Sequence, residues 1–243
     1  QPVLLTASTA LWRAWQEGNG GQPAILAGHS LGEYSALVCA GALAFEEGVS
    51  LVHKRGKLMQ EAVPEGEGAM AAILGLGDEV VADCCEQVEG VVSPANYNAP
   101  SQVVIAGSAP AVALAVEACN EAGARKAVPL QVSGPFHCEL MAPATVGFAE
   151  ALSAVDLKMP EIPVVRNVDA SVAADLADLR EKLMEQIARP VQWTRCMQAM
   201  IDAGADQFVE CGAGKVLAGL IKRIDRKMPV HNIDTPEAFA AAI

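Results

Sequence analysis

Residues 28–32, Gly28-His29-Ser30-Leu31-Gly32, decide the fold of this chain. An apolar run over 24–28 predicts a strand before them, and small and apolar residues over 31–40 predict a helix after them. A Gly-x-Ser-x-Gly pattern between a strand and a helix is a nucleophile elbow, a tight turn that exposes the serine side chain. Ser30 is therefore the candidate nucleophile. The backbone N–H of Leu31, at the start of the helix, is the candidate donor to an oxyanion.

Outward from the elbow, the pattern predicts an α/β protein. Strands are expected at 162–167, 206–211 and 229–233. Alternation of strands with helices is typical of a mostly parallel sheet covered on both faces. The expected helices span 2–17, 45–62, 139–153, 175–188, 191–203, 215–226 and 235–243.

Residues 68–131 form a separate pattern of alternating elements. Strands are expected at 69–74, 91–94, 102–106 and 127–131, with helices at 78–87 and 109–122. The residues at 96–100 are expected to connect the second and third of these strands. The resulting β-α-β-β-α-β order is ferredoxin-like. We therefore predict a small domain over 63–130, inserted into a large domain formed by 1–62 and 131–243.

Composition excludes several classes of protein. The 243 residues carry a formal net charge of −12, which argues against general nucleic-acid binding. No apolar run approaches the roughly 20 residues that a membrane span needs. The seven cysteines contain no Cys-x-x-Cys pair, so they read as reduced thiols of a cytoplasmic protein rather than a disulfide framework or zinc site.

A serine nucleophile needs a base, and the residues alone leave two candidates. His137 lies in a Gly-Pro loop after a strand, where functional groups often occur. His231 lies near the C-terminus with Asp234 close by, which fits the Ser, acid, His order of ordinary α/β-hydrolases. His29 is expected to be a packed histidine, and His53 a surface residue.

Two basic features stand out in an acidic chain. Arg55, on the predicted helix at 45–62, could hold a substrate carboxylate through two hydrogen bonds if it faces the active site. The helix that begins at 215 has a basic face, which indicates either an anionic partner or a solvated surface. Its candidate docking residues are Lys222, Arg223, Arg226 and Lys227.

Six motifs in this order resemble the malonyl-CoA:acyl-carrier-protein transacylase family of bacterial type II fatty acid synthesis. They are Gly28-His29-Ser30-Leu31-Gly32-Glu33-Tyr34, Arg55-Gly56, Asn96-x-Asn98-x-Pro100-x-Gln102, Phe136-His137, Pro190-Val191-Gln192-Trp193 and Gly212-x-Gly214-x-Val216-Leu217. The resemblance covers the whole chain. It implies an α/β-hydrolase-like parallel-sheet core with an inserted ferredoxin-like small domain.

The resemblance also implies roles for individual residues. It assigns the base to His137, with the backbone carbonyl of Gln186 orienting the ring in place of a triad acid. It matches Arg55 to the arginine that pairs with the malonyl carboxylate. Phe136 matches the variant associated with malonyl rather than methylmalonyl units. Asn98, and with less support Asn96 and Gln102, match residues near the substrate.

The function implied is transfer of a malonyl group from coenzyme A to the phosphopantetheine thiol of acyl carrier protein through a malonyl-serine. No metal or redox cofactor is implied, and we expect a cytoplasmic monomer whose basic helix face docks the carrier protein. Two rival interpretations are a serine hydrolase such as a thioesterase, and a truncated, inactive form that only binds carrier protein.

The chain departs from the family pattern at two places. Ala213 replaces a proline in the Gly-Pro-Gly turn, which is expected to be mild. The opening strand and the Gly-Gln-Gly-x-Gln loop, whose glutamine N–H is the second oxyanion donor in the family, have no counterpart here. We therefore expect the 243-residue chain to react slowly, because losing one oxyanion donor typically costs about 10²–10³ in rate.

Overall fold

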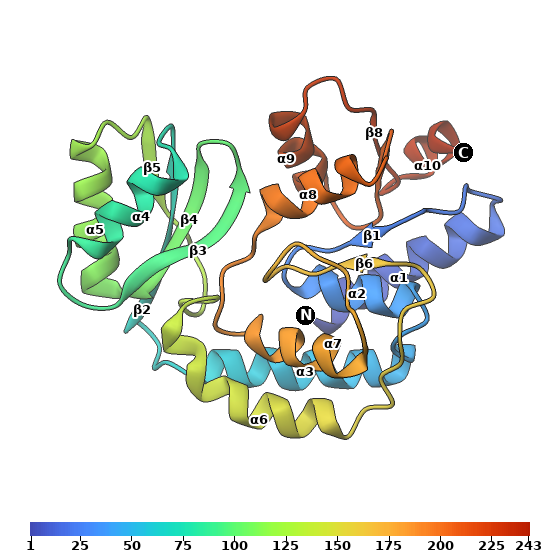
Figure 1. Ribbon diagram of the computed structural model, residues 1–243, viewed down its shortest axis with the longest axis horizontal. Coiled ribbons are helices and arrows are strands. Elements are labelled where there is room, and N and C mark those ends of the chain that lie inside the picture. The colour runs from blue at the N-terminus through green and yellow to red at the C-terminus, as the bar shows by residue number, and fades with distance from the viewer. The chain divides into compact units, whose positions relative to one another are not determined.

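The computed structural model describes all 243 residues, which form two compact units. The first unit contains residues 1–53, 155–179 and 195–243, and the second contains 54–154 and 180–194. Figure 1 labels their helices and strands. The α/β class predicted from the sequence is confirmed. None of the helices combines the length and the apolar character that a membrane crossing requires.

Two short parallel strand pairs lie in the first unit. β1 (Leu26–Ala27) pairs with β6 (Val164–Val165), and β7 (Phe208–Glu210) pairs with β8 (Val230–Asn232). The helices of this unit are α1 (Pro2–Glu17), α2 (Leu31–Cys39), most of α8 (Trp193–Asp202), α9 (Val216–Ile224), α10 (Pro236–Ala242), and the first parts of α3 (Phe45–Glu61) and α7 (Leu176–Glu185).

These parallel strands are shorter than the sequence predicts. The expected ranges 24–28 and 162–167 each retain only two paired residues. β1 ends at Ala27 because Gly28 already belongs to the turn that leads into α2. Ahead of β6, Pro163 accepts a hydrogen bond from the Leu26 N–H but has no N–H of its own to extend the ladder.

An aromatic cluster joins the two ends of the chain within the first unit. Trp12 and Trp15 of α1 pack with Ile233, which follows β8. The Trp15 ring meets Phe239 of α10 edge-on, with the ring centroids 6.2 Å apart. Burial of these large side chains holds α1 against the C-terminal segment.

The second unit contains a four-stranded antiparallel sheet with the order β3-β4-β2-β5. Its elements are β2 (Gly68–Leu74), α4 (Asp78–Glu86), β3 (Val92–Ala99), β4 (Gln102–Ser108), α5 (Ala109–Glu121) and β5 (Lys126–Pro129). The short helix η1 (Glu139–Met141) and α6 (Ala142–Ser153) follow. This chain order and strand order are ferredoxin-like, which confirms the prediction for this segment.

Alternate residues of β2 and β4 build a different core on each face of the sheet. Ala71, Ile73 and Ile105 pack beneath α4 and α5, which cover one face in Figure 1. Met70, Val104 and their alternating neighbours face the other way and pack with Phe136 and Cys138. The sheet therefore supports the loop that carries His137.

β3, the second strand of this sheet in chain order, is longer than the sequence predicts. Residues 96–99 were expected in a connection, but β3 runs through them to Ala99. Its register against β4 shifts between Pro94 and Asn96 and again between Tyr97 and Ala99. The low strand propensity of asparagine is overridden here by sheet pairing, with irregularities that accommodate it.

The predicted division into a small domain at 63–130 and a large domain at 1–62 and 131–243 stays a prediction. Compactness groups the chain differently, because residues 54–62, 131–154 and 180–194 join the unit that holds the antiparallel sheet. The ferredoxin-like order itself does not depend on these boundaries.

Candidate active site

Ser30 occupies the turn between β1 and α2 in a strained backbone conformation. Its φ is 53° and its ψ is −107°, a combination that non-glycine residues rarely adopt. A Cβ on Gly28 would lie 1.9 Å from backbone atoms of Gly32, so the close approach requires glycine at position 28. A Cβ on Gly32 would meet no atom within 4 Å. The turn therefore depends on the first glycine of the pattern rather than on both.

The amide of Leu31 is the first of α2. The first N–H groups of a helix have no intrahelical carbonyl to bind, and they lie at the positive end of the helix dipole. Gly32 N–H donates to the His29 carbonyl at 2.9 Å and Glu33 N–H donates to the Ser30 carbonyl at 3.1 Å. These bonds close the turn around the serine and leave its side chain at the helix N-terminus.

Asn167, which sequence reasoning did not single out, holds the backbone of this turn. Its Oδ1 accepts from the Ser30 N–H at 2.6 Å and its Nδ2 donates to the Gly28 carbonyl at 2.8 Å. Its own N–H donates to Glu33 Oε2 at 2.9 Å. The side chain is fully buried. The side-chain amide thus holds the backbone just before the serine, and the Asn167 N–H contacts Glu33 just after it.

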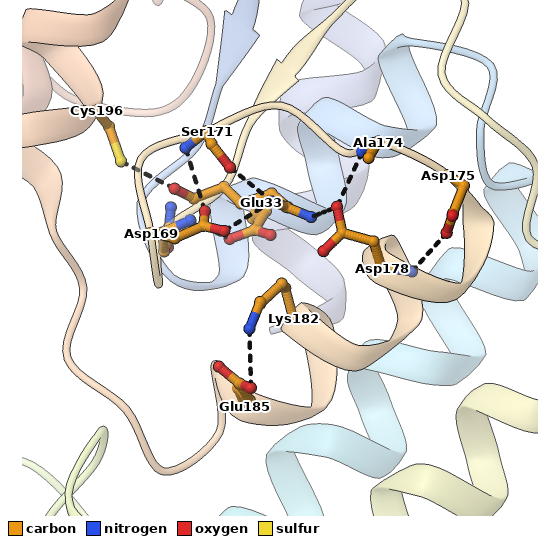
Figure 2. Close-up of polar contacts among 11 residues, drawn as sticks. Glu33, Asp169, Ser171, Ala174, Asp175, Asp178, Lys182, Glu185 and Cys196 are labelled. Carbon is orange, nitrogen blue, oxygen red and sulfur yellow. Dashed lines mark hydrogen bonds and ion pairs between the residues drawn. The ribbon is translucent and has the colours of Figure 1, made fainter.

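The loop after β6 that carries Asn167 is fixed by a buried cation. Arg166 is 3% exposed and pairs with Asp169 and Asp178, each at 2.7 Å. Its backbone carbonyl accepts from the Cys196 thiol. Figure 2 shows Asp169, Ser171 and Asp178 gathered at this loop. Because the buried guanidinium would be left uncompensated without these two partly exposed carboxylates, the loop has a well-defined position next to the elbow.

We expect Asn167→Ala to impair both the fold and the acylation step. The change leaves the Ser30 N–H and the Gly28 carbonyl without this partner in a buried site, a loss of about 1–3 kcal/mol in the free energy of unfolding. Denaturant unfolding measures that loss, and the rate of Ser30 acylation measures the loss of geometry. Asn120→Ala, on the exposed surface of α5, is the matched control and should change stability by no more than about 0.5 kcal/mol. Equal effects of the two changes would contradict this role of Asn167.

In the second unit, His137 is held by a backbone carbonyl. Its Nδ1 lies 2.8 Å from the carbonyl oxygen of Gln186, and the residue is 4% exposed. A carbonyl only accepts, so Nδ1 carries the proton and Nε2 carries the lone pair of the neutral ring. His137 also has a positive φ of 62°, so its backbone is strained like that of Ser30. The ring is arranged as a base that is oriented by a neutral acceptor.

Arg55 contacts the same glutamine through a different atom. Its Nη2 donates to Gln186 Oε1 at 3.0 Å, and the arginine is 1% exposed. The contact joins α3 to the end of α7. Arg55 therefore lies inside the protein and not on a solvated helix face, the alternative that its sequence position leaves open.

The remaining predicted substrate residues lie in the second unit with these groups. Asn96 and Asn98 belong to β3, and Gln102 begins β4. Asn96 is 7% exposed, and Gln102 Oε1 is buried without a hydrogen-bond partner. Phe136 is half-buried against the sheet. Their roles toward a substrate stay predictions.

Cys138, next to His137, is not a rival nucleophile. Burial raises the pKa of its thiol to about 11, and its Sγ donates to the Pro135 carbonyl at 3.0 Å. Only the thiolate attacks an acyl group, so a thiol with this pKa is almost entirely inactive at neutral pH. Serine remains the one activated nucleophile proposed for this chain.

The predicted docking residues lie on and just after α9, in the first unit. Lys222, Arg223, Arg226 and Lys227 are all exposed. The Lys222 ammonium donates to the Met228 carbonyl at 2.6 Å, which fixes the turn that carries the other cations. At the other end of α9, the Glu210 carboxylate accepts from the N–H groups of Leu217 and Ala218. Because that carboxylate occupies the helix N-terminus, the Gly212–Lys215 turn does not offer a phosphate site there.

The structure places the predicted residues in two groups. Ser30, Leu31 and the basic residues of α9 belong to the first unit, whereas His137, Gln186, Arg55 and the β3 and β4 residues belong to the second. The alternative base His231 lies in β8 of the first unit, with its backbone paired to Val209. No group of three or more His, Cys, Asp or Glu side chains is placed to hold a metal ion.

Comparison with known proteins matches most of the chain to one family. The acyl transferase domain family matches residues 1–234. The malonyl CoA-acyl carrier protein transacylase of Escherichia coli K12 is 52% identical over 100% of this chain and 79% of its own length. That of Bacillus subtilis 168 is 48% identical over 100% of this chain and 77% of its own length.

Solved structures agree closely in fold. The malonyl CoA-acyl carrier protein transacylase of Coxiella burnetii is 45% identical, with a TM-score of 0.98 over 100% of this chain and 78% of that chain. A malonyl-transacylase in complex with a type II PKS acyl-carrier protein is 47% identical, with a TM-score of 0.98 over 100% of this chain and 79% of that chain.

Proposed function

The chain belongs to the acyl transferase family, and from this membership we infer that it is a transacylase that moves malonyl groups from coenzyme A to acyl carrier protein. The contact that supports the chemistry best is the one between His137 Nδ1 and the Gln186 carbonyl. It orients a histidine base without an acidic partner, as expected for this family. A direct test is the transfer of malonyl from malonyl-CoA to holo carrier protein, followed by the mass of the carrier protein.

The proposed reaction has two half-reactions that share one base. Ser30 Oγ attacks the thioester carbon while His137 Nε2 takes the hydroxyl proton. The oxyanion of the tetrahedral intermediate is stabilised by the Leu31 N–H. Coenzyme A leaves as its thiol with the proton from His137, and malonyl-Ser30 remains. The carrier-protein thiol then gives its proton to His137 and attacks the ester, and Ser30 Oγ recovers a proton as it leaves.

Arg55 is proposed to bind the free carboxylate of the malonyl group throughout. A guanidinium presents two parallel donors, which match the two oxygens of a carboxylate. Its burial strengthens that interaction, because charges attract more strongly where water is excluded. Asn98, Asn96, Gln102 and Phe136 are proposed to lie around the same acyl group.

Arg55→Ala is expected to remove the preference for malonyl over acetyl groups. Losing a buried, charge-assisted contact costs about 2–5 kcal/mol in discrimination. The measurement is kcat/KM for acylation by malonyl-CoA and by acetyl-CoA, with Lys57→Ala as the control, because Lys57 is exposed on the same helix. Unchanged selectivity in Arg55→Ala would contradict its proposed role.

Transfer rather than hydrolysis is the proposed outcome of the acyl-enzyme. A thioesterase needs an activated water, and an acid partner for the histidine would strengthen that activation. His137 instead pairs with a neutral carbonyl.

All chemical steps above use side chains and backbone groups of the chain, so we propose that no metal or redox cofactor takes part. The seven unpaired cysteines support a reducing, cytoplasmic location.

The basic residues of α9 are proposed to dock the carrier protein. With a net charge of −12, the enzyme as a whole would repel an acidic carrier protein, so a local positive patch would steer the encounter. We expect the double change Lys222→Glu with Arg226→Glu to raise the KM for carrier protein roughly tenfold and to weaken its salt dependence.

Transfer to free pantetheine is the control for this patch, because that acceptor lacks the acidic protein. Its rate should change little in the double variant. Equal losses with both acceptors would show that α9 supports the fold or the chemistry rather than docking.

A further inference from the structure

Gln186 makes two contacts through two separate parts of the residue. Its backbone carbonyl accepts from His137, and its side-chain Oε1 accepts from Arg55 at 3.0 Å. The residue is fully buried and directly follows α7, where its own N–H donates to the Lys182 carbonyl. The backbone contact orients His137, the proposed base, whereas the side-chain contact holds the guanidinium of Arg55.

We propose that the Gln186 side chain is a positioning residue for substrate specificity, which sets the orientation of Arg55 while keeping its charge available to the substrate carboxylate. This inference rests on the proposed malonyl transfer. It assigns the side chain a task distinct from the carbonyl that orients His137.

The argument depends on the amide being neutral. A guanidinium is planar, so fixing Nη2 against Gln186 Oε1 restricts the plane in which its other donors lie. An amide oxygen provides this restriction without cancelling the positive charge. A carboxylate at the same place would form an ion pair with Arg55 in a buried site and would compete with the carboxylate of the substrate.

The residue before Gln186 carries a carboxylate, and that carboxylate forms an ion pair with a residue of its own helix. Glu185, immediately before Gln186, pairs with Lys182 at 3.0 Å, one turn earlier on α7, and Figure 2 shows this pair. The acidic side chain is thereby engaged along its own helix. The neutral side chain is the one that contacts Arg55.

Gln186→Glu tests the inference most sharply, because it changes the charge while nearly preserving the shape and the backbone carbonyl. We expect kcat/KM for acylation by malonyl-CoA to fall roughly 10- to 100-fold, the scale of one charge-assisted hydrogen bond. Acylation by acetyl-CoA, which has no carboxylate, should fall less, so the ratio of malonyl to acetyl acylation should drop. Gln60→Glu, on the exposed face of α3, is the matched control for added negative charge.

Gln186→Met is the second variant, because it removes the acceptor without adding a charge. It should reduce malonyl acylation less than Gln186→Glu does, and it should again lower malonyl acylation more than acetyl acylation. Thermal unfolding shows whether each variant is folded, and the Met variant decides the question if the Glu variant is not. Rates of malonyl-Ser30 formation by mass spectrometry provide the measurement for both.

The possible outcomes separate this inference from the proposed function. If wild type forms no malonyl-Ser30, malonyl transfer itself is wrong. If wild type does, and Arg55→Ala loses malonyl preference while both Gln186 variants keep it, only the role of the Gln186 side chain is wrong. Equal losses with malonyl and acetyl groups would mean that Gln186 acts through His137 alone, which also overturns the inference.

Discussion

Ser30→Ala is expected to abolish malonyl transfer, with a loss on the order of 10⁶-fold, as found when an enzyme loses its serine nucleophile. The loss is large because the acyl-serine is an obligatory intermediate of the proposed two-step route. Alanine fits the same turn but supplies no oxygen to attack the thioester. Intact mass after treatment with malonyl-CoA should show one added malonyl group in wild type and none in the variant.

The position of the adduct provides a further check. Peptide mapping should place the malonyl group on the peptide that contains Ser30. Ser50→Ala, on the exposed surface of α3, should label as wild type does. Labelling that persists in Ser30→Ala would mean that another side chain is the nucleophile, and the mechanism above would be abandoned.

His137→Ala is expected to lower the acylation rate by about 10²–10⁴-fold, the usual contribution of a general base. The ring is held by the Gln186 carbonyl so that Nε2 has the lone pair needed to take the Ser30 proton. Single-turnover acylation by malonyl-CoA measures the effect, because it isolates the step in which the base acts. Binding of coenzyme A should change far less.

His231→Ala distinguishes the two histidines that the residues alone leave open. His231 lies in β8, where its backbone is part of a parallel pair. We expect this variant to acylate nearly as fast as wild type. The opposite pattern, a silent His137→Ala and a damaging His231→Ala, would favour the Ser, acid, His order of ordinary hydrolases.

The parts of this protein that could be predicted from sequence are those whose signals are local. The elbow at 28–32 depends on a strand, a turn and a helix that follow one another, and the structure has all three there. The ferredoxin-like order also follows from consecutive periodic segments. Arg55 stood out as a possible carboxylate-binding residue, but Gln186 was identified only through resemblance, because their contact joins positions 131 residues apart.

Asn167 shows what sequence reasoning missed and why. Its bond to the Ser30 N–H spans 137 positions, and the strand expected at 162–167 placed it inside a ladder rather than after one. The expected parallel strands did offer a signal that points to Asn167. β1 and β6 are parallel, so the residues after Ala27 and Val165 meet at the same sheet edge, where functional groups collect in α/β proteins. Asparagine just past β6 was a candidate on that ground.

The pairing of Val191 with β3 has a consequence for aggregation, because β3 is an edge strand of the antiparallel sheet. Val191 bridges to Asn96, its carbonyl accepts from the Tyr97 N–H, and its N–H donates to the Ala95 carbonyl. Those backbone groups of the outermost strand are therefore not available to another chain. The opposite edge, β5, carries Lys126 and Pro129, and a charge and a missing donor both discourage strand addition. The Val191 pairing on one edge and the composition of β5 on the other therefore both discourage the edge-to-edge pairing through which β-proteins aggregate.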